Sequence, residues 1–303
     1  MEQIIQTLAQ ELGRPIEHIQ NVVTLIDEGA TIPFIARYRK ELHGSMDDQL
    51  LRALADRLQY LRNLQQRREE VTALIDAQNK LTEELSAAIQ NAATLAEVED
   101  LYRPYKQKRR TRATVAKEKG LEPLAQLAYA LKTPAVDMEQ AAQDYIDPEK
   151  GVETVQDALQ GASDIIAEWI SDDAEVRKML RELYLRRGML VSRAAAKEPE
   201  DSVYRLYYEF KCPVGRVQGY QTLAINRGER EDILKAGVEL DPETAHISVR
   251  RMTVPNRAAM EFVRAAADDA YDRLLQPSLE REIRAYLTDQ ANEGAIHMFA
   301  LNL

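Results

Sequence analysis

The sequence predicts an all-α fold, multihelical and elongated, with a long spine helix and an embedded helix-turn-helix module. Three observations support this prediction. Hydrophobic side chains make up 45% of the 303 residues and charged ones 30%, while only 12 Gly and 11 Pro interrupt the chain. Apolar residues recur at helical spacing along most of the sequence. Residues 47–78 keep this spacing with neither Gly nor Pro, which predicts one helix about 48 Å long at about 1.5 Å per residue.

Three short helices are expected before the spine helix, and capped helices after it. The first ends at Gly13, the second runs from Pro15 to Gly29, and the third begins at Pro33. Thr82 has the position of an N-cap residue for the helix that follows the spine.

Further helices are predicted in the middle of the chain. Apolar positions over 152–170 predict a helix with a break at Gly161, and Ser171 is expected to cap the next helix over 175–187. Residues 189–191 are too few to predict a strand. Two helices followed by a short wing-like piece would suit a helix-turn-helix unit.

We therefore expect three parts. Residues 1–115 form an N-terminal helical region, residues 116–195 a helix-turn-helix-like module, and residues 196–303 an irregular segment followed by C-terminal helices that pack on the N-terminal region. The irregularity lies in 197–251, where Gly and Pro fall among aromatic and β-branched residues. The apolar pattern continues to Leu303, so we expect downstream domains that this sequence does not contain.

Charge and cysteine usage limit the class of protein. The 50 acidic against 40 basic residues give a net charge of -10, so any contact with nucleic acid must come from a local basic patch. Cys212 is the single cysteine, no signal peptide follows Met1, and no apolar run reaches the roughly 20 residues that cross a bilayer. These observations predict a cytoplasmic protein without a membrane partner.

Motifs for catalysis or cofactor binding are not found. The four histidines, at positions 18, 43, 246 and 297, lack metal-ligand spacing, so we expect no metal site. The sequence has no Walker loop, no G-x-G-x-x-G and no G-x-S-x-G. We therefore predict no enzyme activity and no cofactor.

A basic segment at Tyr102–Arg112 is the most concentrated chemical signal. Its candidate nucleic-acid-binding residues are Tyr105, Lys106, Lys108, Arg109, Arg110 and Arg112. They form a basic loop that could hold RNA or DNA weakly, or could instead pair with acidic residues of the chain or dock on a neighbouring domain. The shorter Arg37–Lys40 cluster has the same two interpretations, with the structural one favoured.

Three segments resemble the Tex family of bacterial transcription accessory proteins: Leu25–Glu41, Glu99–Thr111 and Leu223–Glu229. The resemblance implies a multihelical N-terminal region with a helix-turn-helix, followed in full-length members by an RNase-H-like domain, helix-hairpin-helix elements and an OB-fold. It also implies that nucleic acid is bound mainly by that OB-fold, so this region would bind weakly. One departure is Tyr220–Gln221, where the family commonly has His-Arg.

Two functions are compatible with these observations. The first is a non-catalytic N-terminal scaffold that organises the downstream domains of a Tex-like RNA-binding protein and contacts the transcription machinery. The alternative is a self-sufficient helix-turn-helix regulator, which predicts a two-fold symmetric dimer that reads DNA sequence in the major groove. The alternative lacks an evident zipper or basic recognition helix.

Overall fold

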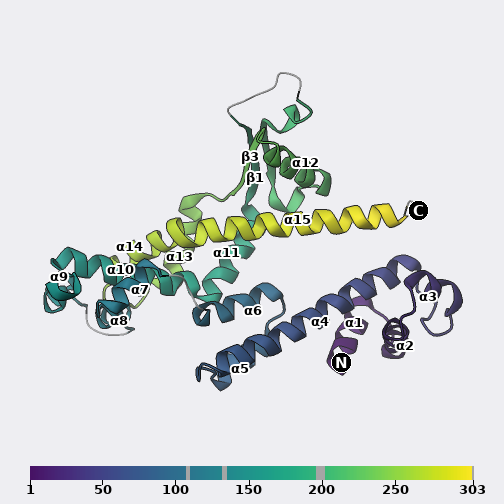
Figure 1. Cartoon of the computed structure of the whole chain (residues 1–303), viewed down its shortest axis with the longest axis horizontal. Coiled ribbons are helices and arrows are strands. Elements are labelled where there is room, and N and C mark those ends of the chain that lie inside the picture. Colours follow the sequence, from purple (N-terminus) through teal and green to yellow (C-terminus); the bar gives the residue numbers. More distant parts are fainter. Residues whose placement is uncertain (107–109, 132–134, 196–201, 302–303) are drawn as a thin grey trace. The chain divides into compact units, whose positions relative to one another are not determined.

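The computed structural model describes residues 1–106, 110–131, 135–195 and 202–301, with side chains described up to residue 292. The chain divides into two compact units, Met1–Tyr105 and Lys106–Leu303. Helices form most of both units (Figure 1), which confirms the predicted all-α class apart from one small sheet.

Three short helices open the first unit, as predicted. They are α1 (Glu2–Leu12), α2 (Ile16–Asp27) and α3 (Ile32–Tyr38). Gly13 ends α1 with a φ of 60°, a left-handed conformation that favours glycine. The apolar faces of the three helices pack on the first half of α4 (Asp48–Asp76). This first core contains Ile5, Leu8, Ile19, Val22, Val23, Ile35, Leu51, Leu54, Leu58 and Leu61.

Helix α4 confirms the predicted spine. It has 29 residues and is therefore about 44 Å long. Asp47 caps it by accepting a hydrogen bond from the Leu50 N–H at 2.7 Å. Helices α5 (Glu83–Asn91), which Thr82 caps as expected, and α6 (Leu95–Tyr102) pack on its second half in a separate core. Figure 1 shows the two groups of helices at opposite ends of α4.

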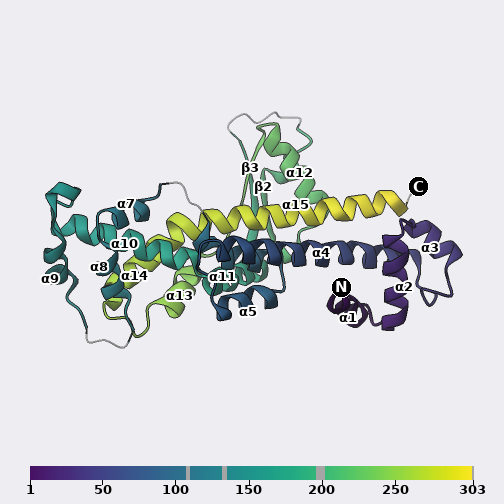
Figure 2. The ribbon, with the colours of Figure 1, turned by 60° about the horizontal axis from the view of Figure 1, so that its bottom comes forward.

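The second unit is built around one large core. Besides α12 (Gly219–Arg230), described below with the sheet, its helices are α7 (Arg112–Glu118), α8 (Glu122–Tyr129), α9 (Met138–Ala142), α10 (Val155–Asp172), α11 (Ala174–Arg187), α13 (Pro242–Thr253), α14 (Met260–Asp269) and α15 (Gln276–Leu301), with a π-helical segment, η6 (Ala270–Leu275), between the last two. Within the core the hydroxyls of Tyr184 and Tyr271 lie 3.1 Å apart, and burial raises the pKa of Tyr184. Figure 2 shows α15 extending the line of α14 along this unit.

Two predicted features of α10 are wrong. The helix has no break at Gly161, which is buried and faces α7 and α8. A Cβ atom there would lie 2.3 Å from Leu121 Cδ1 and 3.3 Å from Ala116 Cβ, so the glycine permits close packing instead of ending the helix. Ser171 is not a cap either, because its hydroxyl donates to the Glu168 carbonyl within α10 and Asp173 caps α11.

A three-stranded antiparallel sheet occupies part of the segment expected to be irregular. The strands β1 (Met189–Ala194), β2 (Glu209–Pro213) and β3 (Leu234–Glu239) lie in the order β2-β1-β3. Leu190 pairs with both Cys212 and Val238, so the partners of β1 are distant in sequence. Helix α12 (Gly219–Arg230) lies beside the sheet, preceded by the 3-10 turns η4 (Arg205–Tyr207) and η5 (Val214–Arg216) (Figure 2).

Asp173 alone joins α10 and α11. Its carboxylate accepts hydrogen bonds from the N–H groups of Glu175 and Val176, at 2.9 and 3.0 Å. A helix-turn-helix joins its two helices by three or four residues. This pair of helices lacks such a turn, and the helix-turn-helix module in 116–195 stays a prediction.

Candidate nucleic-acid interface

The basic loop begins at the end of the first unit, where both of its tyrosines are half-buried. Tyr102 ends α6 and Tyr105 ends the following 3-10 turn, η1 (Arg103–Tyr105), and both pack against the second core of α4. The guanidinium carbon of Arg67 lies 5.6 Å from the centre of the Tyr102 ring, and the Gln78 amide donates to the Tyr105 carbonyl at 3.1 Å. This packing limits the surface of the tyrosines that is available for stacking on bases.

The cations of the loop differ in their surroundings. Lys106 is exposed, and Lys108 and Arg109 lie outside the described residues. Arg110 forms an ion pair with Glu118 at 3.0 Å, with the two side chains 71% and 55% exposed. Such an exposed pair contributes about 0–1 kcal/mol, so a phosphate could replace the carboxylate at little cost. Arg112 is exposed, and its charge acts on Asp164.

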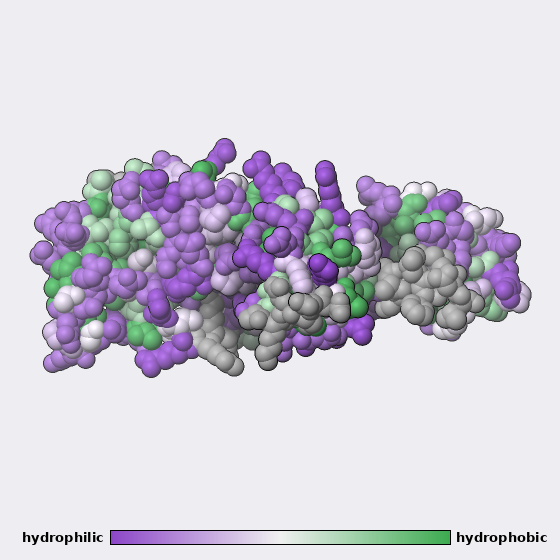
Figure 3. Space-filling view, turned by 90° about the horizontal axis from the view of Figure 1, so that it is seen from above, coloured by the Kyte–Doolittle hydropathy of each residue, from purple (hydrophilic) through white to green (hydrophobic). Residues whose placement is uncertain are grey.

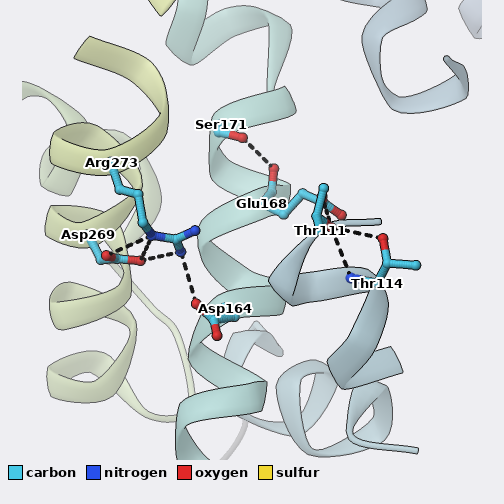
Figure 4. Close-up of polar contacts among 7 residues, drawn as sticks. All are labelled: Thr111, Thr114, Asp164, Glu168, Ser171, Asp269 and Arg273. Carbon is cyan, nitrogen blue, oxygen red and sulfur yellow. Dashed lines mark hydrogen bonds and ion pairs between the residues drawn. The ribbon is translucent and has the colours of Figure 1, made fainter. Parts of the chain in front are cut away.

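The end of the loop is fixed to α10 by Thr111 (Figure 4). The Thr111 hydroxyl accepts a hydrogen bond from the Thr114 N–H at 3.0 Å, which caps α7, and donates to the Glu168 carboxylate at 3.0 Å. The other oxygen of Glu168 lies 3.6 Å from Lys117 Nζ. Any ligand of Arg110 or Arg112 would therefore be held next to a well-anchored helix start.

Arg273 connects two carboxylates beside this anchor (Figure 4). One of its nitrogens lies 2.9 Å from the buried Asp164 of α10 and 2.6 Å from Asp269 of α14. Burial raises the pKa of Asp164, while the charges of Arg273 and Arg112 oppose this rise. The arrangement joins α10 to the π-helical segment, and we assign it a structural role.

The segment Leu223–Glu229, which carries part of the family resemblance, ties α12 to its neighbours. Asn226 accepts a hydrogen bond from Arg284 of α15 at 2.8 Å and donates to Thr288 at 2.9 Å. Glu229 pairs with Arg284 and accepts from the Ala236 N–H of β3 at 3.1 Å. Beside them α12 and α15 line an open groove of about 920 Å³, whose lining includes the exposed Arg227 and Arg230.

The pair that departs from the family pattern lies at the start of α12. The side chain of Gln221 accepts a hydrogen bond from the Gln218 N–H at 2.9 Å as part of a capping box, so it has a local structural role. Tyr220 is 69% exposed. Sequence reasoning did not detect this helix or its groove, because Gly and Pro surround them.

The described residues contain no group of three or more His, Cys, Asp or Glu side chains placed to hold a metal ion. Among these same residues, no helix combines the length and the apolar character needed to cross a membrane. Charged and polar side chains dominate the face shown in Figure 3, where hydrophobic ones form small groups.

The chain is thus a mainly helical protein with local basic patches. Residues 2–76 match the Tex-like protein N-terminal domain, and residues 133–299 match the Tex central region-like model. The chain belongs to the Tex family.

Three relatives illustrate the match. The uncharacterized protein YdcI of Bacillus subtilis is 47% identical over 98% of the chain, and the transcriptional accessory protein Tex of Neisseria gonorrhoeae is 36% identical over 99%. The human S1 RNA-binding domain-containing protein 1 is 31% identical over 99%. The chain spans 42%, 40% and 31% of the lengths of these three relatives.

Proposed function

We propose that this chain is the non-catalytic N-terminal scaffold of a Tex-like transcription accessory protein that binds RNA or DNA in its full-length form. Family membership over nearly the whole chain supports the transcription role, as does the name of the gonococcal relative. The name of the human relative, which mentions an S1 RNA-binding domain, supports RNA as a ligand of the longer protein. We place its action in the cytoplasm.

The observation that carries the scaffold role is the construction of α4. A single helix supports two separate hydrophobic cores, one with α1–α3 and one with α5 and α6. Ion pairs fasten neighbouring segments to the same helix, including Arg57 with Glu11 at 2.7 Å and Arg62 with Asp27 at 2.8 Å. Because other helices pack on both halves of α4, this helix is suited to holding those helices at fixed positions.

The basic loop would add a weak contact with nucleic acid. Arg110 and Arg112 are exposed on an anchored helix start, which favours phosphate contact, but the half-buried tyrosines provide little stacking. We therefore expect most affinity to come from the remaining part of the longer protein, and the loop or neighbouring surfaces to contact its downstream domains or the transcription machinery. Nothing in the described geometry favours the self-sufficient regulator.

Comparing the nucleic-acid affinity of a full-length relative with that of its N-terminal segment tests this proposal. The full-length gonococcal relative and its segment equivalent to this chain would be titrated against the same labelled RNA and DNA. We expect the segment to bind at least about tenfold more weakly, with affinity that falls as salt rises. Equal affinity of the segment, or sequence-specific binding by a dimer of the segment, would refute the scaffold role and favour the regulator.

The absence of catalysis needs its own measurement. The chain would be incubated with Mg²⁺, ATP and labelled RNA or DNA, and both phosphate release and strand cleavage would be followed. We expect neither above the level of a buffer control. A reproducible activity that one carboxylate substitution abolishes would contradict a non-catalytic role.

A further inference from the structure

Helix α3 exposes two aromatic rings that do not belong to the first core. Ile35 is completely buried and attaches α3 to the first core of the unit. Phe34 and Tyr38, one helical turn apart on a neighbouring side of the helix, are 40% and 56% exposed. Their ring centres lie 5.3 Å apart, at an angle of 45°. They therefore present a continuous aromatic surface to solvent.

One cation lies over the Phe34 ring, and two more are close to Tyr38 in the sequence. The guanidinium carbon of Arg39 lies 5.2 Å from the centre of the Phe34 ring, and its Nη1 donates to the Tyr38 carbonyl at 3.2 Å. Arg37 and Lys40 are exposed on either side of Tyr38 in the sequence. We call Phe34, Arg37, Tyr38, Arg39 and Lys40 the α3 surface.

The cations of the α3 surface differ from four arginines of α4. On α4, Arg52, Arg57, Arg62 and Arg67 each have a carboxylate partner within 3.0 Å. Within the described part of the chain, Arg37, Arg39 and Lys40 form no ion pair. The interpretation of this cluster as a structural basic patch requires acidic partners, and none of the described carboxylates pairs with these cations. In a chain with a net charge of -10, such unpaired cations create a local positive site.

We propose that the α3 surface binds single-stranded nucleic acid, with bases stacked on Phe34 and Tyr38 and phosphates beside the three cations. The proposal rests on the nucleic-acid function proposed above and names a site for it outside the basic loop. Aromatic rings accept any base because every base has a π-face, and cations follow the backbone. In a duplex the base faces are covered by their neighbours, so rings on an outward helix face cannot reach them. The occupant is therefore a single strand.

Two variants of the whole chain, each with several substitutions, test the site. The charge variant combines Arg37→Gln, Arg39→Gln and Lys40→Gln, and the ring variant combines Phe34→Leu and Tyr38→Leu, which keeps apolar side chains on the helix. The charge control combines Arg52→Gln, Arg57→Gln and Arg62→Gln, which removes the same number of charges from paired positions. The ring control is Tyr286→Leu, which removes a 46% exposed tyrosine from α15. Circular dichroism and thermal melting would verify that each variant folds.

Binding would be measured by fluorescence anisotropy with labelled single-stranded RNA of about 12 nucleotides, a length within the usual range of such sites, and with the matching duplex. We expect the charge and ring variants to bind the single strand roughly fivefold to tenfold more weakly than the wild type, and both controls to stay within about twofold of it. The duplex should bind more weakly than the single strand.

Several outcomes would overturn the proposal. Wild-type affinity of both test variants would do so, as would equal losses in a test variant and its control. If a polyglutamate peptide binds the chain and loses affinity in the α3 variants, while RNA binding does not change in them, the α3 surface is a protein-docking site. The full-length gonococcal relative serves as the reference: if it binds the RNA and the α3 variants behave as wild type, only this inference fails. If that relative does not bind at all, the proposed function fails.

Discussion

The hydroxyl of Thr111 donates a hydrogen bond to the carboxylate of Glu168, 57 residues further along the chain, at 3.0 Å. The same oxygen caps α7. One side chain therefore determines both where the basic loop ends and where α7 packs on α10.

Replacing Thr111 by Ala should destabilise the second unit. The change removes an N-cap, worth about 1 kcal/mol, and leaves the half-buried Glu168 without one partner, so we expect a loss of about 1–2 kcal/mol in the free energy of unfolding. Urea unfolding followed by circular dichroism would measure it. Thr111→Ser keeps the hydroxyl and should remain within about 0.5 kcal/mol of the wild type. Equal losses in the two variants would show that the methyl group, not the hydroxyl, matters.

Replacing Gly161 by Ala should also destabilise the unit, although alanine favours helix. The added Cβ would approach Leu121 and Ala116 more closely than packing allows. Overpacking typically costs about 1–3 kcal/mol and the gain in helix propensity is about 1 kcal/mol, so we expect a net loss of about 1 kcal/mol in urea unfolding. The control is Gln156→Ala, at an exposed position of the same helix, which should change little. A more stable Gly161→Ala protein would contradict close packing at this glycine.

Replacing Arg273 by Met should cost about 2 kcal/mol of stability at neutral pH, because it removes the ion-pair partner of the buried Asp164 and leaves only the more distant charge of Arg112 to oppose its desolvation. Burial already raises the pKa of Asp164, and losing the arginine should raise it further. A carboxyl whose pKa is higher in the folded than in the unfolded protein destabilises the fold most above its folded-state pKa; the penalty falls as the pH drops below that value and is gone below the unfolded-state pKa.

The difference in stability between wild type and Arg273→Met should therefore shrink when the pH is lowered from about 7 to about 5. Urea unfolding at both values would test this. Adding Asp164→Asn to the variant removes the buried charge and should recover part of the lost stability. A deficit independent of pH, with no recovery in the double variant, would show that lost packing of the arginine stem is the cause.

Local sequence signals were sufficient for the helices of the first unit. Helix α4 was predictable because its apolar spacing is uninterrupted and Asp47 precedes it as a cap. The sheet was not, because β1 finds its partners about 20 and 45 residues away in short strands, and no local pattern encodes such pairing. Gly161 was mispredicted for a similar reason. Whether a glycine ends a helix or allows another helix to pack closely against it depends on tertiary contacts, which the local sequence does not show.

The candidate sites show a similar division. Sequence identifies clusters of cations and aromatics but not their partners. The longer cluster, around Arg110, proves to have half-buried tyrosines and at least one paired cation, whereas the shorter one, at Arg37–Lys40, has exposed rings and no ion pair among the described residues. The length of a basic cluster in the sequence therefore does not show how accessible its rings and cations are to a ligand.

The salt dependence of binding tests most directly the central claim that this acidic chain is a scaffold with local contacts for nucleic acid. The wild-type chain would be titrated against labelled single-stranded RNA at several salt concentrations. We expect weak, roughly micromolar affinity at low salt and a logarithmic slope of about -2 to -4, which corresponds to roughly three to six phosphate contacts at about -0.7 each. No binding at low salt, or binding that does not change with salt, would contradict it.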